Sequence, residues 1–212
     1  MKKFYLFFLL PLASQAATYT QPVNILVPDN NLTGLSSTIT VSGDSTSITG
    51  LQVVLNLTGT QTAGWSGDIY CYLTHGAGFS VLLNRIGRTT ANPAGNGNNS
   101  LTLTLSDTAA TDVHAATPTS SALAGTFLPD ARNVSPTSTT TIMDAATRTA
   151  SLGVFNTADS NGTWTLFVAD VASGGTMTLS SWQLTVNPVP EPSAAALSAL
   201  GLASLVLRRR RR

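Results

Sequence analysis

The chain has 212 residues, of which 42% are hydrophobic and only 10% are charged, and its formal net charge is +1. Between residues 17 and 189 there are four arginines, nine aspartates and no lysine, so this part alone has a net charge of −5. An acidic, lysine-free segment lacks the basic surface that nucleic acids require, and we expect no nucleic-acid partner. Its length suffices for one domain with a hydrophobic core.

The N-terminal end has the pattern of a secretory signal peptide over residues 1–16. Lys2 and Lys3 form a basic region, residues 4–13 are almost all apolar, and Ala16 places a small residue at the expected cleavage position. We expect signal peptidase to cleave after Ala16, so that the rest of the chain leaves the cytoplasm.

The middle of the chain predicts an all-β fold. Residues 17–47 are polar, and we expect a strand with loops there. From residue 48 onward, apolar residues recur at every second position, which is typical of strands with one buried face. The alternating runs are Leu51–Leu57, Ile69–Leu73, Leu101–Leu105, Trp164–Val168 and Trp182–Val186. Before the C-terminal tail no segment has the period of an amphipathic helix, so we predict an antiparallel, jelly-roll-like sandwich over residues 48–187.

One long stretch of the predicted sandwich is irregular. Residues 108–150 are rich in serine, threonine, alanine and proline, with few large apolar residues. A long loop in a compact domain is usually functional or disordered. Here we expect an ordered but irregular crossover between the sheets, because Phe127, Leu128 and Met143 offer anchoring points.

Three residues of the alternating runs suit the core. Trp164 and Trp182 are expected to bury their rings there, in preference to stacking on a ligand. Cys71 is the only cysteine, so no intramolecular disulfide can form. Its apolar neighbours favour a buried thiol, and a bridge between chains is the alternative.

Four segments of the middle region combine strand residues with turn residues in a distinctive order. They are Leu51–Leu57 with Trp65–Ile69, Leu105–Ala109, Gly125–Pro129, and Phe155–Leu166 with Asp170 and Trp182. In order and spacing they resemble the P domain, or P/Homo B domain, of subtilisin-like proprotein convertases and secreted bacterial proteases. The last segment resembles the closing hairpin of that family, although Asn156 replaces a family glycine. The resemblance implies a jelly roll without its neighbouring protease domain, so any endopeptidase activity would belong to a partner.

No catalytic arrangement is visible in the sequence. Neither His75 nor His114 lies in a triad motif, and Glu191 is the only glutamate. We therefore predict no enzymatic activity, no catalytic residues, no metal site and no cofactor. Calcium is a candidate ligand because five aspartates lie at predicted strand ends or in loops, although such residues usually solvate turns. These are Asp68, Asp107, Asp130, Asp159 and Asp170.

The C-terminal residues 188–212 combine three parts in a fixed order. The motif Pro190-Glu191-Pro192 comes first, an uncharged stretch over residues 193–207 follows, and five arginines end the chain: Arg208, Arg209, Arg210, Arg211 and Arg212. As a helix the stretch would be about 22 Å long, short of the ~30 Å hydrocarbon core. This length suits transient insertion, with the arginines as a basic stop on the cytoplasmic side.

This arrangement closely resembles the PEP-CTERM sorting signal of Gram-negative bacteria. The resemblance implies that an exosortase is a partner and that the tail is processed near Pro190-Glu191-Pro192. It also implies export to the cell envelope, the cell surface or the extracellular space, with transient anchoring in the inner membrane. An ordinary C-terminal anchor with a basic stop is the alternative.

Together these patterns predict a non-enzymatic secreted or surface-associated protein with a structural or adhesive role in the extracellular polysaccharide matrix. One alternative is a carbohydrate-binding module, which would need exposed, coplanar aromatic rings such as those of Tyr70 and Tyr72. A second is an accessory P-domain-like module of a secreted serine protease system. A third is a hydrolase with an unrecognised site.

Overall fold

The computed structural model describes residues 15–43, 47–59, 64–117 and 121–188. The apolar part of the predicted signal peptide, the Pro190-Glu191-Pro192 motif, the short apolar stretch and the five arginines lie outside these ranges. Among the described residues no helix has both the length and the apolar character needed to cross a membrane.

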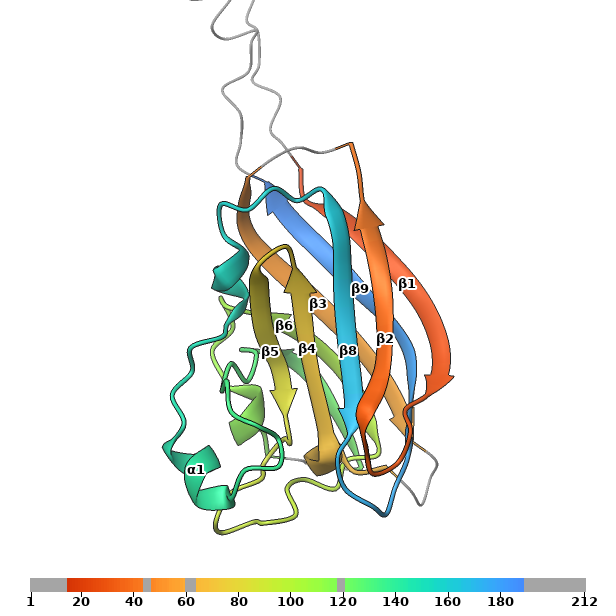
Figure 1. The fold of residues 1–212 in the computed structure, drawn as a ribbon, viewed down its shortest axis with the longest axis vertical. Coiled ribbons are helices and arrows are strands. Elements are labelled where there is room, and N and C mark those ends of the chain that lie inside the picture. Colours follow the sequence, from red (N-terminus) through yellow and green to blue (C-terminus); the bar gives the residue numbers. More distant parts are fainter. Residues whose placement is uncertain (1–14, 44–46, 60–63, 118–120, 189–212) are drawn as a thin grey trace, which may run out of the picture.

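Nine strands dominate the described part of the chain (Figure 1). They are β1 (Ala17–Leu26), β2 (Asn31–Val41), β3 (Ile48–Gly59), β4 (Ile69–His75), β5 (Gly78–Asn84), β6 (Ser100–Ser106), β7 (Ala122–Phe127), β8 (Gly162–Asp170) and β9 (Met177–Pro188). The helical elements are short: α1 (Thr140–Ala145) and the 3₁₀ turns η1 (Ser66–Asp68), η2 (Val113–Ala115) and η3 (Leu152–Phe155).

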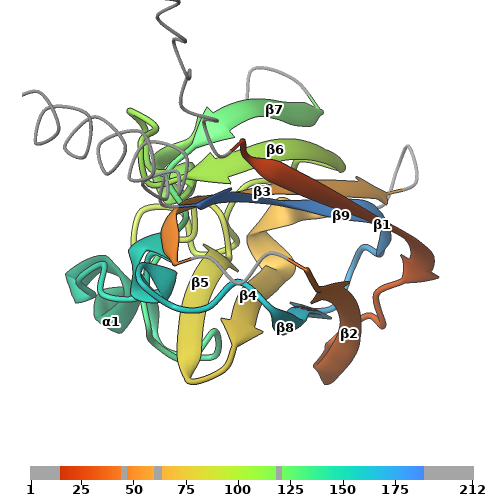
Figure 2. The ribbon, with the colours of Figure 1, turned by 90° about the horizontal axis from the view of Figure 1, so that it is seen from above.

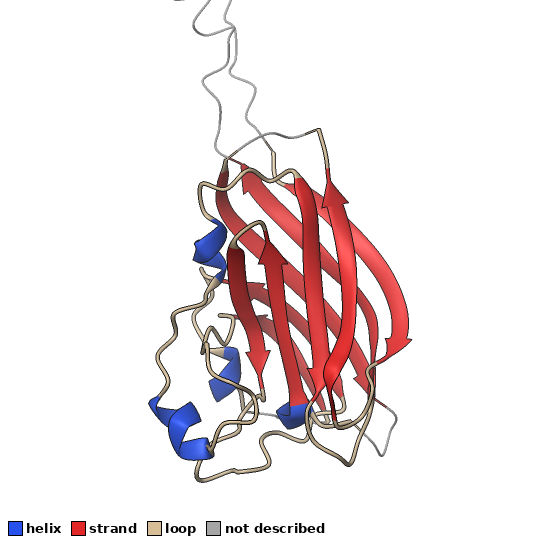
Figure 3. Cartoon of the chain, viewed as in Figure 1, coloured by secondary structure: helices blue, strands red, loops and turns tan. Residues whose placement is uncertain are grey.

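The strands form two facing sheets, which confirms the predicted all-β sandwich (Figures 2 and 3). One sheet has five strands in the order β1-β9-β3-β6-β7, and the other has four in the order β2-β8-β4-β5. The pairs are antiparallel except β6 and β7, which run parallel because the chain crosses from one to the other through irregular structure. In the view of Figure 2, the described chain leaves the outer face of β2, β8 and β4 uncovered, and α1 lies beside β5.

The polar region before residue 48 contributes a strand to each sheet. β1 pairs with β9 and β2 pairs with β8, so residues 17–41 are an integral part of the sandwich and are not separate from it. Both strands lie at an edge of their sheet. An edge strand presents much of its surface to water, which explains the weak apolar pattern of this region.

The predicted closing hairpin is wrong. β8 pairs with β2 and β4, whereas β9 pairs with β1 and β3, so the two strands belong to opposite sheets. The connection between them crosses the sandwich. Trp164 and Trp182 therefore enter the core from opposite sides, and both are fully buried.

The core lies between the sheets and is built from the alternating positions. Leucines at alternate positions of β3 and β6 are at most 5% exposed, as are Trp164 and Trp182. The indole N–H of Trp164 donates to the carbonyl oxygen of Ser160 at 3.0 Å, and that of Trp182 donates to Oγ of Ser37 at 3.0 Å. Both rings therefore bury their apolar surface without leaving a polar group unpaired.

Cys71 lies in the core from β4 and is fully buried, as predicted. Burial raises the pKa of its thiol, because a thiolate in an apolar environment is poorly solvated. A thiol that is both buried and protonated is unreactive toward other chains.

The irregular crossover is ordered where it is described, as predicted, but it contains more regular structure than its composition suggests. It holds η2, the edge strand β7 and the helix α1, which begins after the capping residue Thr139. Met143 is fully buried, and Phe127 and Leu128 are half-buried. These three residues anchor the crossover against the rest of the domain.

Candidate functional site

A large cavity lies at one end of the sandwich, and we call it the end pocket. Its volume is about 890 Å³. Three parts of the chain that are far apart in sequence form it: the β4–β5 turn, the segment from η3 to the start of β8, and a short part of the crossover. The residues that matter below are His75, Phe79, Asn133, Thr149, Val154, Asn156, Thr157, Asp159 and Thr163.

The β4–β5 turn is tight because two glycines meet its steric demands. The strands are joined by Gly76 and Ala77 alone, and Gly76 has φ +55°, as the first central residue of a two-residue hairpin loop often has. At Gly78 an added Cβ would lie only 2.5 Å from a ring atom of Phe155. The absence of a side chain there lets η3 pack directly against the hairpin.

His75 ties the turn to the opposite wall of the pocket. Its Nε2 lies 2.8 Å from the carbonyl oxygen of Asp159, and its Nδ1 lies 3.1 Å from that of Thr163. The ring also stacks on Trp164, with centroids 4.0 Å apart and planes 5° apart. Because both ring nitrogens already face backbone carbonyl groups, His75 holds the pocket together and is not available as a catalytic base.

Thr157 has a strained backbone in the pocket wall. Its φ is +69°, which is rare for a β-branched residue. Its N–H donates to the carbonyl oxygen of Ile48 at 2.9 Å, and the N–H of Ile48 donates to that of Ala158 at 3.1 Å. These two bonds to the start of β3 hold the strained conformation in place.

Replacing Thr157 with glycine is expected to raise the free energy of unfolding by roughly 0.5–1 kcal/mol, since the left-handed conformation costs a non-glycine residue about 1–2 kcal/mol and glycine loses part of this gain through chain entropy. Chemical denaturation measures the change. Thr163→Gly is the matched control, because Thr163 lies in β8 with ordinary strand geometry and should lose stability. If Thr157→Gly is also destabilising, the side chain of Thr157 stabilises the folded state by more free energy than the strained backbone conformation costs.

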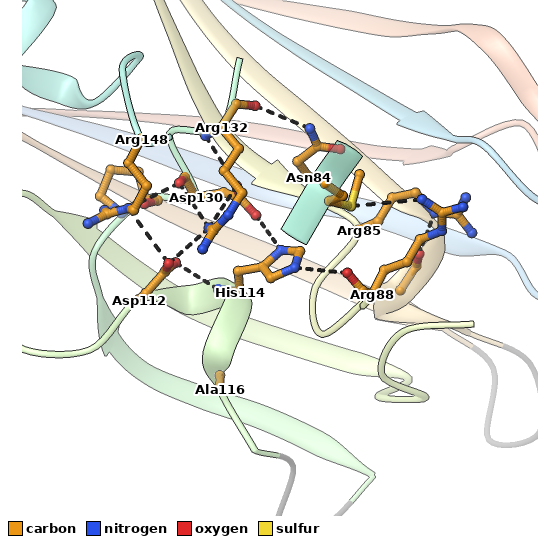
Figure 4. A network of polar contacts seen from close by, with 12 residues as sticks. Asn84, Arg85, Arg88, Asp112, His114, Ala116, Asp130, Arg132 and Arg148 are labelled. Carbon is orange, nitrogen blue, oxygen red and sulfur yellow. Dashed lines mark hydrogen bonds and ion pairs between the residues drawn. The ribbon is translucent and has the colours of Figure 1, made fainter. Parts of the chain in front are cut away.

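A second concentration of polar groups is the Asp130 cluster, which we define as Asp112, His114, Asp130, Arg132 and Arg148 (Figure 4). Asp130 is fully buried and accepts from His114 Nδ1 at 2.7 Å and from Arg132 at 3.3 Å. Arg132 also pairs with Asp112 at 2.9 Å. Arg148 donates to the carbonyl oxygen of Pro129 at 2.7 Å. The cluster joins separate parts of the crossover to one another. It also joins the crossover to the end of β5, where the side-chain amide of Asn84 donates to the carbonyl oxygen of Arg132 at 3.2 Å.

His114 and Asp130 are the residue types of a catalytic His-Asp pair, but the contacts of the His114 ring differ from those of a catalytic base. Its Nε2 lies 3.0 Å from the carbonyl oxygen of Arg88, so both ring nitrogens face acceptors, and only the imidazolium form could donate to both. Burial lowers the pKa of His114, but the hydrogen bond and charge of Asp130 outweigh it, and the net pKa is raised. An imidazole whose two nitrogens both face acceptors within the protein is not in a position to take a proton from a nucleophile.

The five loop aspartates do not converge. Asp107 accepts from the N–H groups of Leu152 and Gly153, and Asp159 accepts from the N–H of Asn161 at 2.9 Å. Asp130 belongs to its own cluster. Only Asp68 and Asp170 are neighbours, and Asp68 pairs with Arg85 at 3.2 Å. Among the described residues no group of three or more histidine, cysteine or acidic side chains has an arrangement that could hold a metal ion.

Asp170 should make stability depend on pH. It is fully buried, and its Oδ2 has no hydrogen-bond partner among the described residues. Burial raises the pKa of Asp170 to about 7, and the charges of Asp68 and Asp29 add to this. Between pH ~4 and ~7 the unfolded chain has released this proton while the folded chain retains it, so stability falls as pH rises through that window.

The free energy of unfolding of wild type should fall between pH 4.5 and pH 7.5. In Asp170→Asn we expect this fall to be smaller by roughly 2 kcal/mol. Urea denaturation at the two pH values measures the difference. Asp159→Asn, at an exposed aspartate, is the control and should follow wild type. An Asp170→Asn variant with the pH dependence of wild type would show that this carboxyl ionises normally in the folded state.

Tyr70 and Tyr72 lie on the outer face of the four-stranded sheet, but not as the coplanar platform that sugar stacking would need. Their ring planes differ by 60°. Tyr72 instead stacks on Phe167 of β8, with centroids 4.6 Å and planes 16° apart, and lies 5.0 Å from Phe79 of β5. Phe167, Tyr72 and Phe79 form a half-buried row across β8, β4 and β5, which we call the aromatic strip, and Phe79 also lines the end pocket.

The sequence patterns did not identify the end pocket. Asn133, Asn156 and Thr157 belong to segments without a local motif, and only the fold brings them together. The glycine-rich turn after His75 and the Asn161-Gly162 dipeptide were the available signals, and both mark turns without indicating a shared cavity.

The comparison with protein families agrees with the C-terminal pattern. Residues 188–212 match the family model described as the PEP-CTERM protein-sorting motif. This confirms the predicted sorting signal, which implies processing by an exosortase and export to the cell envelope or surface. No curated protein matched the chain.

Among solved structures, the chain is similar to the serine protease of Aeromonas sobria, with 17% identity over 84% of this chain and 28% of that one and a TM-score of 0.43. It is also similar to the complex of that protease with the chaperone ORF2, with 15% identity over 82% of this chain and 27% of that one and a TM-score of 0.42. The chain thus spans little more than a quarter of the length of these structures.

Proposed function

We propose that this protein is a non-enzymatic component of the extracellular polysaccharide matrix, with a structural or adhesive role. The observation that carries the proposal is the surface chemistry of the strands. The nine described strands contain no lysine, arginine or glutamate, and their single aspartate, Asp170, is buried. Their outward positions are mainly threonine, serine, asparagine, glutamine and aromatic residues.

Such a surface suits a hydrated, hydroxyl-rich polymer better than a charged partner. The row Thr38, Thr165 and Thr74 crosses β2, β8 and β4 on the outer face of the four-stranded sheet. Hydroxyl groups both donate and accept hydrogen bonds, so they exchange readily between water and the hydroxyls of a sugar. Soluble proteins usually protect exposed sheet edges with charge, and the lack of charge here needs a functional reason.

The absence of enzymatic activity is part of this proposal. His75 and His114, the two histidines of the chain, have both ring nitrogens occupied by acceptors within the protein. Neither is in a position to activate a serine or a water molecule. The proposed role also needs no cofactor, and calcium binding by the loop aspartates is not part of it.

Transport completes the proposal. Signal peptidase would cleave after Ala16, the stretch over residues 193–207 would anchor transiently in the inner membrane, and Arg208–Arg212 would hold its end in the cytoplasm. Support comes from charge: moving each arginine across costs about 2.5–3.5 kcal/mol on the translocon scale, which a short apolar segment cannot offset. The exosortase would then process the tail near Pro190-Glu191-Pro192.

The resemblance of residues 48–187 to P domains supports a P-domain-like jelly roll, and an accessory module of a secreted protease system is the second candidate. The two roles differ in where the protein is retained. In cells that cannot make the matrix polysaccharide, a matrix component should pass from the matrix fraction into the medium. Retention that instead depends on a secreted serine protease, and not on the polysaccharide, would favour the accessory role and contradict the proposal.

A further inference from the structure

We propose that the end pocket is a binding site for a short, neutral segment of polysaccharide, with the aromatic strip continuing the contact across the sheet. This inference rests on the proposed matrix role and names the ligand class and the residues that would recognise it. Four observations support it: the size of the pocket, the rigidity of its walls, the chemistry of its lining and the strained residue in its wall.

The size of the pocket fits a small ligand. Its volume of about 890 Å³ falls within the ~300–1,000 Å³ that small-molecule sites usually have. The walls come from three segments that converge at one end of the sheets, near the β4–β5 turn at the top of that hairpin in Figure 1. The ends of sandwiches are where loops can vary without disturbing the core.

The walls are fixed before any ligand arrives. His75 joins the β4–β5 turn to the segment before β8 through its two hydrogen bonds and its stacking on Trp164. The crossover is joined to β5 at Ala150, whose carbonyl oxygen accepts from Val81 N–H at 2.9 Å and from Ser80 Oγ at 3.0 Å. A preformed site loses little conformational entropy on binding, which favours affinity for a flexible ligand.

The lining favours a neutral, hydroxylated ligand. Asn133, from the crossover, and Asn156, from the segment after η3, are both exposed and line the pocket, and each amide offers two donors and one acceptor oxygen. Thr149 and Thr157 add exposed hydroxyl groups. Among the described residues that line the pocket there is no arginine or lysine, and Asp159 is the one acidic residue, so these residues offer no cation to pair with a phosphate, sulfate or uronate.

Apolar surface lies beside these polar groups. Val154 is 42% exposed and Phe79 is half-buried, and both line the pocket. Phe79 is the first ring of the aromatic strip, with Tyr72 and Phe167 following at centroid distances of 5.0 Å and 4.6 Å. A sugar ring has an apolar C–H face and a polar rim, so amides and apolar side chains side by side match both of its surfaces.

The strain at Thr157 also indicates function. A β-branched residue at φ +69° is costly, and such conformations concentrate at binding and catalytic sites. Here the strained residue projects from a pocket wall next to Asn156 and is held by hydrogen bonds to β3. A glycine would remove the strain but also the hydroxyl group.

The test uses protein extracted from the cell surface and titration calorimetry against defined hexasaccharides. Maltohexaose, cellohexaose and mannohexaose are the neutral probes, and an oligogalacturonate of the same length is the anionic probe. Wild type should bind at least one neutral probe. The double variant Asn133→Ala with Asn156→Ala should bind it at least tenfold more weakly. Asn187→Ala, at an exposed asparagine in a different depression, should bind as wild type does.

The outcomes separate this inference from the proposed function. Equal binding by the double variant and wild type, at equal thermal stability, overturns the pocket assignment and leaves the matrix role standing. Preference for oligogalacturonate overturns the neutral ligand class. If wild type binds no neutral probe, the inference fails, and the matrix-fraction experiment with polysaccharide-deficient cells decides the matrix role independently. Tenfold weakening confined to the double variant supports the assignment.

Discussion

Replacing Trp164 or Trp182 with alanine is expected to lower the free energy of unfolding by roughly 3–5 kcal/mol each. Both side chains are fully buried and come from opposite sheets, so each truncation leaves a large cavity in the shared core. It also leaves the partner of each indole N–H, the carbonyl oxygen of Ser160 or Oγ of Ser37, without its hydrogen bond. Urea denaturation followed by circular dichroism measures the loss.

Trp65→Ala is the matched control, because Trp65 is 41% exposed and its ring lies beside Gly97, in a loop outside the core. Its indole N–H donates to the carbonyl oxygen of Ala94 at 3.1 Å, so a loss of about 1 kcal/mol is expected. Losses below about 1 kcal/mol at both Trp164 and Trp182 would contradict their burial and revive stacking on a sugar as their role.

Replacing Asp130 with alanine is expected to cost roughly 3–5 kcal/mol, because removing one partner of a buried ion pair leaves uncompensated charge. Asp130 is fully buried. Its replacement leaves the ring of His114 without its carboxylate partner and removes one of the two carboxylates that face Arg132. The unfolding transition monitored in urea at pH 6 gives the loss directly.

The same variant should change the pH dependence of stability. The pKa of His114 is raised in the folded state, so the stability it confers is present below about 6.5, the ordinary histidine value, and is lost as pH rises through the folded value. In Asp130→Ala this loss should shrink. Asp159→Asn, at an exposed aspartate outside the cluster, is the control and should keep the wild-type pH profile. An unchanged profile in Asp130→Ala would contradict the raised pKa of His114.

The alternating leucines, valines and tryptophans predicted the central strands correctly, because a strand buried on one face needs an apolar residue at every second position. β1 and β2 were missed as paired strands because edge strands expose more of their surface. β7 was missed because Leu123 is its only buried residue. The closing hairpin, which the family resemblance suggested, was wrong because β8 lies between β2 and β4 in one sheet, whereas β9 lies between β1 and β3 in the other.

The sorting signal could be predicted from sequence because its three parts are contiguous and each follows from a local property: proline, apolar length and charge. The end pocket could not, since Asn133 and Asn156 line the same cavity only because the crossover returns to β5. The burial of Cys71 was predictable from its apolar neighbours. The occupation of both nitrogens of His75 and His114 was not, because three of the four acceptors are backbone carbonyl groups, which have no sequence signature, and the fourth, Asp130, is distant in sequence from His114.

The most direct measurement is the intact mass of the protein extracted from the extracellular matrix, in cells with and without the exosortase. In cells with the enzyme we predict the mass of a polypeptide that begins after Ala16 and ends near Pro190-Glu191-Pro192. Without it, we predict a cell-associated form that retains Arg208–Arg212 and is absent from the matrix. A matrix-bound species that retains these arginines, at the same level in both kinds of cell, would contradict exosortase-dependent delivery to the matrix.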